Sequence, residues 1–258
     1  MKRTLLATGL ALLATPLLAQ NPLIVAPKAY KLWFENDWVR VVRVHYGPRE
    51  QVIAHDHTPT STAYVYLNNS GPVVFNHLDK DYGGVTREPT KAGAFRVYYG
   101  LQEVHEVSNA SDLPSDFLRV EFKTVATGEM GLKGKFFRES YPEGDVFQKI
   151  QFENEQIRIT RLNWPVGKKV TFATAPAVPT LVVALSESGS SVSVDAASKK
   201  TRVDLGHGQS RFIGLKQSEE WENTGKGPIE VLRFDFKTPP MSKEDLEKKN
   251  KKHEHAKS

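Results

Sequence analysis

Short hydrophobic runs separated by turn-forming residues make up most of this chain. Val39 and Val41 alternate with polar neighbours, and Ala63 to Leu67 form a short continuous apolar run that ends at the turn-forming Asn68-Asn69-Ser70-Gly71. Alternation with period two is typical of a strand with one buried face, and a short apolar run fits a buried strand. Many short strands at spacings of about ten residues predict an antiparallel barrel or sandwich.

This pattern occurs twice along the sequence. Phe34-Glu35-Asn36 returns 118 positions later as Phe152-Glu153-Asn154, and the strand-like segment 117–124 returns 114 positions later as 231–238. The small difference in offset corresponds to a few deleted loop residues. Such internal similarity predicts two related all-β domains.

The boundaries of these domains follow from composition. We expect an N-terminal barrel over 20–126, a glycine-containing linker over 127–145, a C-terminal barrel over 146–238 and a charged, disordered tail over 239–258. The tail follows two consecutive prolines and is rich in lysine and glutamate, which is typical of a segment without a core.

The first 19 residues have the pattern of a secretory signal. Lys2 and Arg3 precede an apolar run from Leu5 to Leu18, and the small residue Ala19 supplies a cleavage point. The run is short and contains Pro16, so we expect no stable membrane span. The predicted location is therefore secreted or periplasmic.

Composition narrows the possible chemistry. The chain has no cysteine, so disulfides, thiolate metal sites and cysteine nucleophiles are excluded. The net charge of +5 lies mostly in the first residues and in the tail, and no basic stripe interleaved with aromatic residues is present. Nucleic acid is therefore not an expected partner.

Histidines are concentrated in the first half. His55 and His57 are two apart on a predicted strand, so they point to the same face, and His105 lies on a later strand that can be its neighbour in a barrel. Three neutral imidazoles suit Fe, Mn, Zn, Ni or Cu. The competing interpretation is that these imidazoles are hydrogen-bonded core residues. We expect His45 to be structural and His77, near a turn, to lie at the surface.

At these residues the sequence resembles the cupin superfamily. Gly47 followed by His55-Asp56-His57 is similar to the first cupin motif, and His105 followed by Asn109 is similar to the second. Together with the repeat, the resemblance implies a bicupin: two tandem cupin-type double-stranded β-helix (jelly-roll) barrels, the first binding a divalent metal. It also makes a homo-oligomer plausible.

Two departures from the family pattern matter. The usual glutamate ligand falls on Ser61 or Thr62, which leaves three histidines, with Glu103 as an accessory carboxylate because it shares strand parity with His105. Tyr64 and Tyr66 are candidate hydrogen-bond donors to a ligand. In the second half Ala173, Ala175 and Glu219 stand at the three histidine positions, although Asn223 keeps the asparagine, so this half is not expected to bind metal.

The sequence therefore predicts an exported bicupin that binds a metal through His55, His57 and His105 and takes a small molecule as ligand or substrate. Dioxygenase-like and isomerase-like chemistry are both open. The alternative is a non-catalytic cupin that binds a small ligand or serves as a scaffold without metal. Substrate and metal identity are not specified by these residues.

Overall fold

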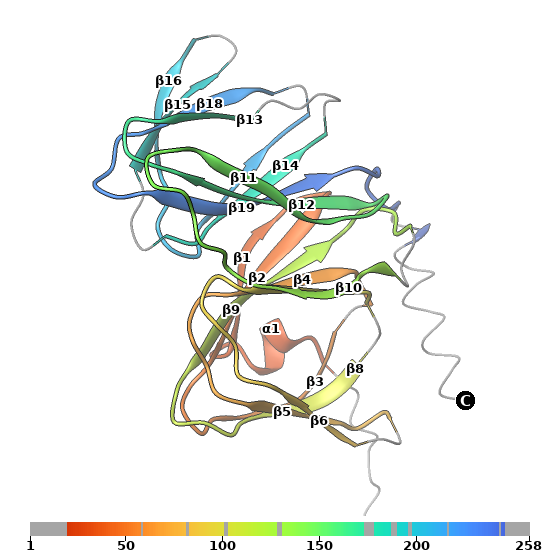
Figure 1. Cartoon of the computed structure of the whole chain (residues 1–258). Helices are drawn as coiled ribbons and strands as arrows, with labels where there is room; N and C mark the ends of the chain where they lie inside the picture. Colours follow the sequence, from red (N-terminus) through yellow and green to blue (C-terminus); the bar gives the residue numbers. More distant parts are fainter. Residues whose placement is uncertain are drawn as a thin grey trace, which may run out of the picture.

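The computed structural model describes residues 20–57, 59–80, 83–100, 103–127, 131–172, 178–186, 190–195, 198–215, 217–242 and 244–245 (Figure 1). The predicted signal peptide, Ala173, Ala175 and most of the predicted tail lie outside these residues. The described chain is almost entirely antiparallel β-structure, with one short helix, α1 (Pro22–Val25). None of its helices is long and apolar enough to cross a membrane.

The first barrel consists of two facing antiparallel sheets. The larger sheet has the strand order β1 (Tyr30–Glu35), β2 (Val39–Tyr46), β9 (Ser115–Phe122), β4 (Thr62–Tyr66), β7 (Phe95–Tyr98) and β10 (Lys133–Phe136). The smaller sheet has the order β3 (Gln51–His57), β8 (Glu103–Asn109), β5 (Val73–His77) and β6 (Gly84–Arg87).

The second barrel repeats this arrangement. Its larger sheet has the order β11 (Phe147–Glu153), β12 (Ile157–Trp164), β19 (Ile229–Phe236), β14 (Thr180–Ala184) and β17 (Ser210–Ile213). Its smaller sheet has the order β13 (Lys169–Phe172), β18 (Glu219–Asn223), β15 (Ser190–Asp195) and β16 (Lys200–Asp204). Even a local irregularity recurs, since the register shifts between Leu32 and Phe34 and again between Ile150 and Phe152.

The two larger sheets pack against each other between the barrels (Figure 1). Strands β9 and β19 are buried on both faces, one toward the barrel interior and one toward the partner sheet. Phe122 of β9 contacts Phe234 and Phe236 of β19, with ring centroids 6.4 and 6.0 Å apart. This explains why nearly every position of the two strands is buried, charged Arg119 and Glu121 included, because a strand covered on both faces has no side open to solvent.

The segment predicted as a linker adds a strand to the first barrel. β10 pairs with β7, and Phe136 stacks on Phe95 with ring centroids 4.8 Å apart. The beginning of the predicted tail is also held by the fold, because Pro240 bridges to Thr124 and Met241 donates its N–H to the carbonyl of Lys123.

Candidate functional site

The three predicted histidines meet on the inner face of the smaller sheet of the first barrel. His55 lies opposite His105 in the register of β3 and β8, and His57 lies opposite Glu103. One candidate ligand atom from each of the three histidines lies within 4.8 Å of the other two, and all three side chains are buried. The period-two alternation of β3 therefore does bring His55 and His57 to one face.

His55 is oriented by two hydrogen bonds. Its Nδ1 lies 2.8 Å from the carbonyl oxygen of Ile53, and its Nε2 lies 2.9 Å from the Tyr30 hydroxyl. Since a carbonyl only accepts, Nδ1 carries the proton and Nε2 accepts from Tyr30. Tyr46 is 2.6 Å from Tyr30 and donates to it in turn. A metal ligand needs a free lone pair on one ring nitrogen, and this tautomer provides it at Nε2 once Tyr30 is displaced.

His105 is the unsatisfied member of the group. Its side chain is 3% exposed, and neither Nδ1 nor Nε2 has a hydrogen-bond partner within the described chain. The nearest carboxylate oxygen, Oε2 of Glu103, is 3.7 Å from Nδ1. Buried polar atoms are nearly always hydrogen-bonded, so two unbonded nitrogens on one buried ring indicate a missing partner.

Burial keeps these imidazoles neutral. It lowers the pKa of His55, and it lowers the pKa values of His57 and His105 well below their usual range, with the positive charge of Arg119 acting in the same direction. Neutral imidazoles are the form that binds transition metals.

The prediction that His77 lies at the surface is wrong. His77 is 8% exposed and lies opposite His105 in the register of β5 and β8, with ring centroids 5.4 Å apart. β5 ends at His77 and the turn follows it, so the last strand residue still points inward. With Glu103 and His105, His77 forms a second group whose ligand atoms lie within 4.8 Å of one another. His45, in contrast, is half-exposed and pairs with Asp116 at 2.7 Å, away from the site.

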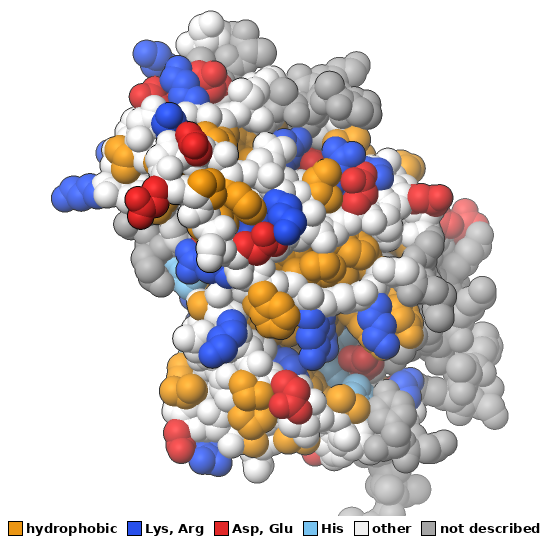
Figure 2. Space-filling view, in the orientation of Figure 1, with side chains coloured by type: hydrophobic (Ala, Val, Ile, Leu, Met, Phe, Trp, Pro, Cys, Tyr) orange, Lys and Arg blue, Asp and Glu red, His pale blue; other side chains and the backbone are white. Residues whose placement is uncertain are grey.

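A cavity of about 330 Å³ adjoins the histidines. His57, His77 and His105 border it from the smaller sheet, and Tyr64 and Tyr66 from the larger one, so both tyrosines singled out in the sequence point inward. Figure 2 shows a hollow in the face of the first barrel, with histidine side chains (pale blue) in it and basic side chains beside it. The volume is at the lower end of the range for small-molecule pockets, about 300–1,000 Å³.

Arginines also line the cavity, and the sequence pattern did not predict them there. Arg119 donates to Glu121 at 2.7 Å, and Arg96 lies over the Tyr64 ring with its guanidinium carbon 4.5 Å from the centroid. Burial by itself lowers the pKa of Arg119, but Tyr64 and Glu121 outweigh it and raise that pKa above its usual value. Arg119 is therefore charged.

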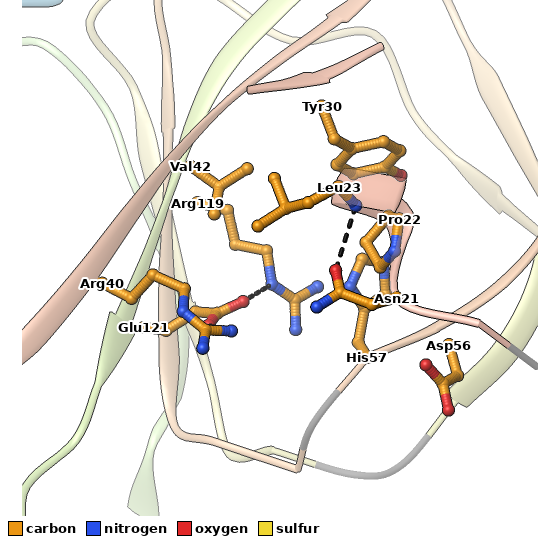
Figure 3. Close-up of a pocket in the computed structure, with 10 residues that line it drawn as sticks. All are labelled: Asn21, Pro22, Leu23, Tyr30, Arg40, Val42, Asp56, His57, Arg119 and Glu121. Atoms are coloured by element: carbon orange, nitrogen blue, oxygen red, sulfur yellow. Dashed lines mark hydrogen bonds and ion pairs between the residues drawn. The ribbon is translucent and has the colours of Figure 1, made fainter. Parts of the chain in front are cut away.

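The end of the barrel next to His57 is closed by the N-terminal segment. Figure 3 shows Asn21, Pro22 and Leu23 beside Arg119 and His57, around a smaller cavity of about 50 Å³. α1 begins at Pro22, and the side-chain oxygen of Asn21 caps it by accepting the N–H of Leu23 at 3.0 Å. The larger cavity opens on the opposite side, where the exposed residues Glu88 and Lys135 line it.

Sequence reasoning missed several residues of this site: Tyr30, His77, Arg87, Arg96 and Arg119. Tyr30 is 25 positions from the His55 that it binds, and nothing local indicates that contact. Arg119 did carry a signal, because the repeat places Arg233 at the equivalent position and both pair with an acid two residues later.

The equivalent region of the second barrel contains no histidine among its described residues. Glu219 stands at the position of His105. It accepts hydrogen bonds from Nη2 and Nε of Arg211, at 2.7 and 3.1 Å, and from Nε1 of Trp221, at 2.7 Å. Phe172 lies opposite Glu219, where the first barrel has His55 opposite His105. Glu219 thus makes polar contacts inside the second barrel, and Trp221 is buried against Phe172, with ring centroids 4.5 Å apart.

Solved structures share this architecture. AerE from Microcystis aeruginosa aligns with a TM-score of 0.59 at 13% identity, over 80% of this chain and 91% of its own. YhaK from Escherichia coli aligns with a TM-score of 0.54 at 13% identity, over 81% and 91%. A salicylate 1,2-dioxygenase from Pseudaminobacter salicylatoxidans aligns with a TM-score of 0.51 at 11% identity, over 78% and 71%.

Identities this low show the fold alone. No protein-family model matches the sequence, and no curated protein matches it. The fold that the resemblance implied is confirmed: the described residues are almost all β-structure and form two tandem cupin-type barrels.

Proposed function

We propose that the first barrel binds a divalent metal ion through His55, His57 and His105 and takes a small molecule into the adjoining cavity. The observation that supports this most strongly is His105, whose two buried ring nitrogens have no partner within the described chain. A metal ion bound by one of these nitrogens would remove part of this cost, because an unsatisfied buried polar atom costs about 1–3 kcal/mol.

The donor set fits such an ion. Three neutral imidazoles suit Fe, Mn, Zn, Ni or Cu, and three protein ligands leave coordination positions open for water or substrate. A bound ion would supply Lewis-acid chemistry or, if redox-active, oxygen chemistry. Dioxygenase-like and isomerase-like activities are both compatible, and a salicylate 1,2-dioxygenase shares the fold.

The chain's own residues have separable parts in this proposal. The carbonyl of Ile53 holds His55 in the tautomer that leaves Nε2 available, and Tyr30 must give up its hydrogen bond to that atom. Glu103 and His77 lie beside His105 and are accessory ligands in place of the missing cupin glutamate.

A second candidate function is a cupin that binds a small ligand, or acts as a scaffold, without metal. The hydrogen bonds of His55 favour it, because both ring nitrogens are satisfied by Ile53 and Tyr30 as in a structural core histidine. In this case the cavity alone carries the function.

Elemental analysis after reconstitution separates the two candidates. The purified protein is compared with a His55→Ala/His57→Ala variant and with a matched control, His45→Ala/His207→Ala, which removes two histidines outside the cluster. We expect close to one equivalent of Fe, Mn, Zn, Ni or Cu in the wild type and the control and none in the first variant. A wild type that stays metal-free, or equal metal in both variants, would overturn the metal proposal.

We also propose that the protein is exported. The basic residues and apolar run before Ala19 support a cleaved signal, and Gln20 is already part of the fold, since its carbonyl accepts the N–H of Asp56 at 3.1 Å. N-terminal sequencing of protein recovered from the periplasm or medium is expected to begin at Gln20. Protein retained in the cytoplasm with residue 1 or 2 at its N-terminus would contradict export.

A further inference from the structure

The larger sheet of the first barrel presents a row of basic side chains to the cavity. Pairing of β9, β4, β7 and β10 places four residues side by side across the sheet: Arg119, Tyr64, Arg96 and Lys135. All four line the cavity. Directly opposed residues on neighbouring strands point to the same face, so this row faces the histidines across the barrel.

Only one arginine in this row has its charge balanced by the protein. Arg119 pairs with Glu121, and the equivalent Arg233 of the second barrel pairs with Asp235 in the same way, at 2.7 Å in both cases. This pair is therefore a feature of the repeated fold. Arg119 is part of the barrel's structure and does not require a ligand to balance it.

Arg96 differs from its counterpart in the second barrel. The equivalent register position holds Arg211, which forms two hydrogen bonds to Glu219. In the first barrel the position of Glu219 is taken by His105, whose imidazole is neutral. Arg96 forms no ion pair with any carboxylate of the described chain, and its buried Nε has no hydrogen-bond partner there. Burial lowers the pKa of Arg96, but Tyr66, Tyr64 and the more distant carboxylate of Glu103 outweigh it and raise that pKa.

Arg87 brings a second uncompensated charge to the same cavity from β6. It is 8% exposed, its Nη2 donates to the hydroxyl of Ser115 at 2.7 Å, and its buried Nε has no partner within the described residues. None of the described carboxylates forms an ion pair with it. Burying a charge without a directly paired counter-ion is costly. Two guanidinium groups on one cavity, neither of them ion-paired with its lining carboxylates Glu88 and Glu103, therefore favour an anionic occupant.

Aromatic rings flank these charges. The guanidinium of Arg87 lies over Tyr66 and Phe117, with its carbon 5.3 and 5.4 Å from the ring centroids, and that of Arg96 lies between Tyr64 and Tyr98. Contact with rings fixes the plane of a guanidinium, and the in-plane N–H groups that the protein does not use can then bond a planar carboxylate. At Arg87, Nη2 already donates to Ser115. Lys135 at the exposed side adds a positive charge along the path of entry.

We propose that this cavity binds a small organic carboxylate, with the carboxylate held by Arg96 and Arg87 and the rest of the molecule directed toward the histidines. The inference deepens the proposed function, since it names the class of ligand for the same cavity, but the carboxylate site does not require a metal. The guanidinium edges supply the recognition, and the tyrosine and phenylalanine rings accommodate a small apolar body.

Calorimetry on the purified protein tests this with benzoate and its uncharged analogue benzamide. The two probes have nearly the same shape, so a difference between them reports the charge. We expect benzoate to bind at least about tenfold more tightly than benzamide, and Arg96→Gln to remove most of that difference. Arg87→Gln is a second variant, in case Arg96→Gln does not fold, as judged by circular dichroism. Arg211→Gln is the matched control in the second barrel and leaves benzoate binding unchanged.

Several results would contradict the inference. Equal binding of benzoate and benzamide, no binding of either, or equal losses in Arg96→Gln and Arg211→Gln would overturn it. Inorganic phosphate binding more tightly than benzoate would assign the cavity to phosphate. Repeating the titration on chelator-treated protein separates the two proposals: benzoate binding that persists without metal supports the carboxylate site alone. If benzoate binding requires metal and is unchanged in Arg96→Gln, the metal proposal is supported and the carboxylate proposal is refuted.

Discussion

In the first barrel, tyrosines, histidines and arginines line much of a cavity of about 330 Å³, whereas the second barrel has Trp164, Phe172 and Trp221 in its buried core. Trp164 occupies the repeat position of Tyr46, and Glu219 that of His105. In the second barrel these three rings are fully buried and Glu219 is bonded to Arg211 and Trp221, although Nε1 of Trp164 has no hydrogen-bond partner among the described residues. In the first, the corresponding positions leave a space and several buried polar atoms without partners.

This difference shows that the same strand arrangement forms around two different interiors, one apolar and one polar. Both barrels keep the strand order, the irregular first hairpin and a buried asparagine, Asn109 or Asn223, that closes the turn before the last strand. One copy uses its interior for hydrophobic stability and the other for polar groups that need a ligand. Functional sites commonly carry such a local cost in stability.

The largest expected effect is on the packed interior. Trp221→Ala removes a fully buried ring that contacts Phe172 and should lower the free energy of unfolding by about 3–5 kcal/mol. Tyr64→Ala, which enlarges a cavity that already exists in the first barrel, should cost less than half as much. Denaturant unfolding followed by circular dichroism measures both, and equal losses would contradict the contrast between a filled and a hollow barrel.

A pH series sharpens the same contrast. Burial depresses the pKa values of His55, His57 and His105. These three imidazoles therefore stay neutral in the folded chain, whereas in the unfolded chain they take up protons below pH about 6.5. The free energy of unfolding of metal-free protein is therefore constant above that pH and should fall as pH decreases, by up to about 1.4 kcal/mol per pH unit for each histidine. Denaturant midpoints between pH 7.5 and 5 test this. A His57→Gln/His105→Gln variant should show a flatter profile, and an unchanged slope would refute the assignment.

The asparagines should behave alike in the two barrels. Nδ2 of Asn109 donates to the carbonyls of Gly47 and Leu113, at 2.7 and 2.9 Å, and Nδ2 of Asn223 donates to those of Trp164 and Gly227, at 3.0 and 2.9 Å. Replacement of either by alanine should cost about 1–3 kcal/mol, because buried carbonyls lose their donor. Thermal unfolding of the two variants measures this. A loss of metal or benzoate binding in Asn109→Ala, with stability unchanged, would show that the residue belongs to the site.

The smallest effect concerns Tyr30. Tyr30→Phe removes the hydroxyl that bonds to Nε2 of His55 and frees this atom for metal. We expect metal affinity to rise by about two- to tenfold, the equivalent of one ordinary hydrogen bond. Competition with a metallochromic chelator measures the change, with Tyr46→Phe as the control that leaves the Tyr30 hydroxyl in place. Weaker metal binding in Tyr30→Phe would instead make Tyr30 a supporting residue of the metal centre.

The sequence by itself determined the duplication, the all-β class, the shared face of His55 and His57 and the loss of histidines from the second copy. These follow from period-two alternation and from direct comparison of the two halves, both of which are local properties of the chain. Only the tertiary structure decided that His77 points inward, that Tyr30 bonds to His55 and that β10 brings Lys135 to the cavity. It also decided which arginines have a counter-ion, because the balance of a buried charge depends on residues that strand pairing brings together from distant parts of the chain.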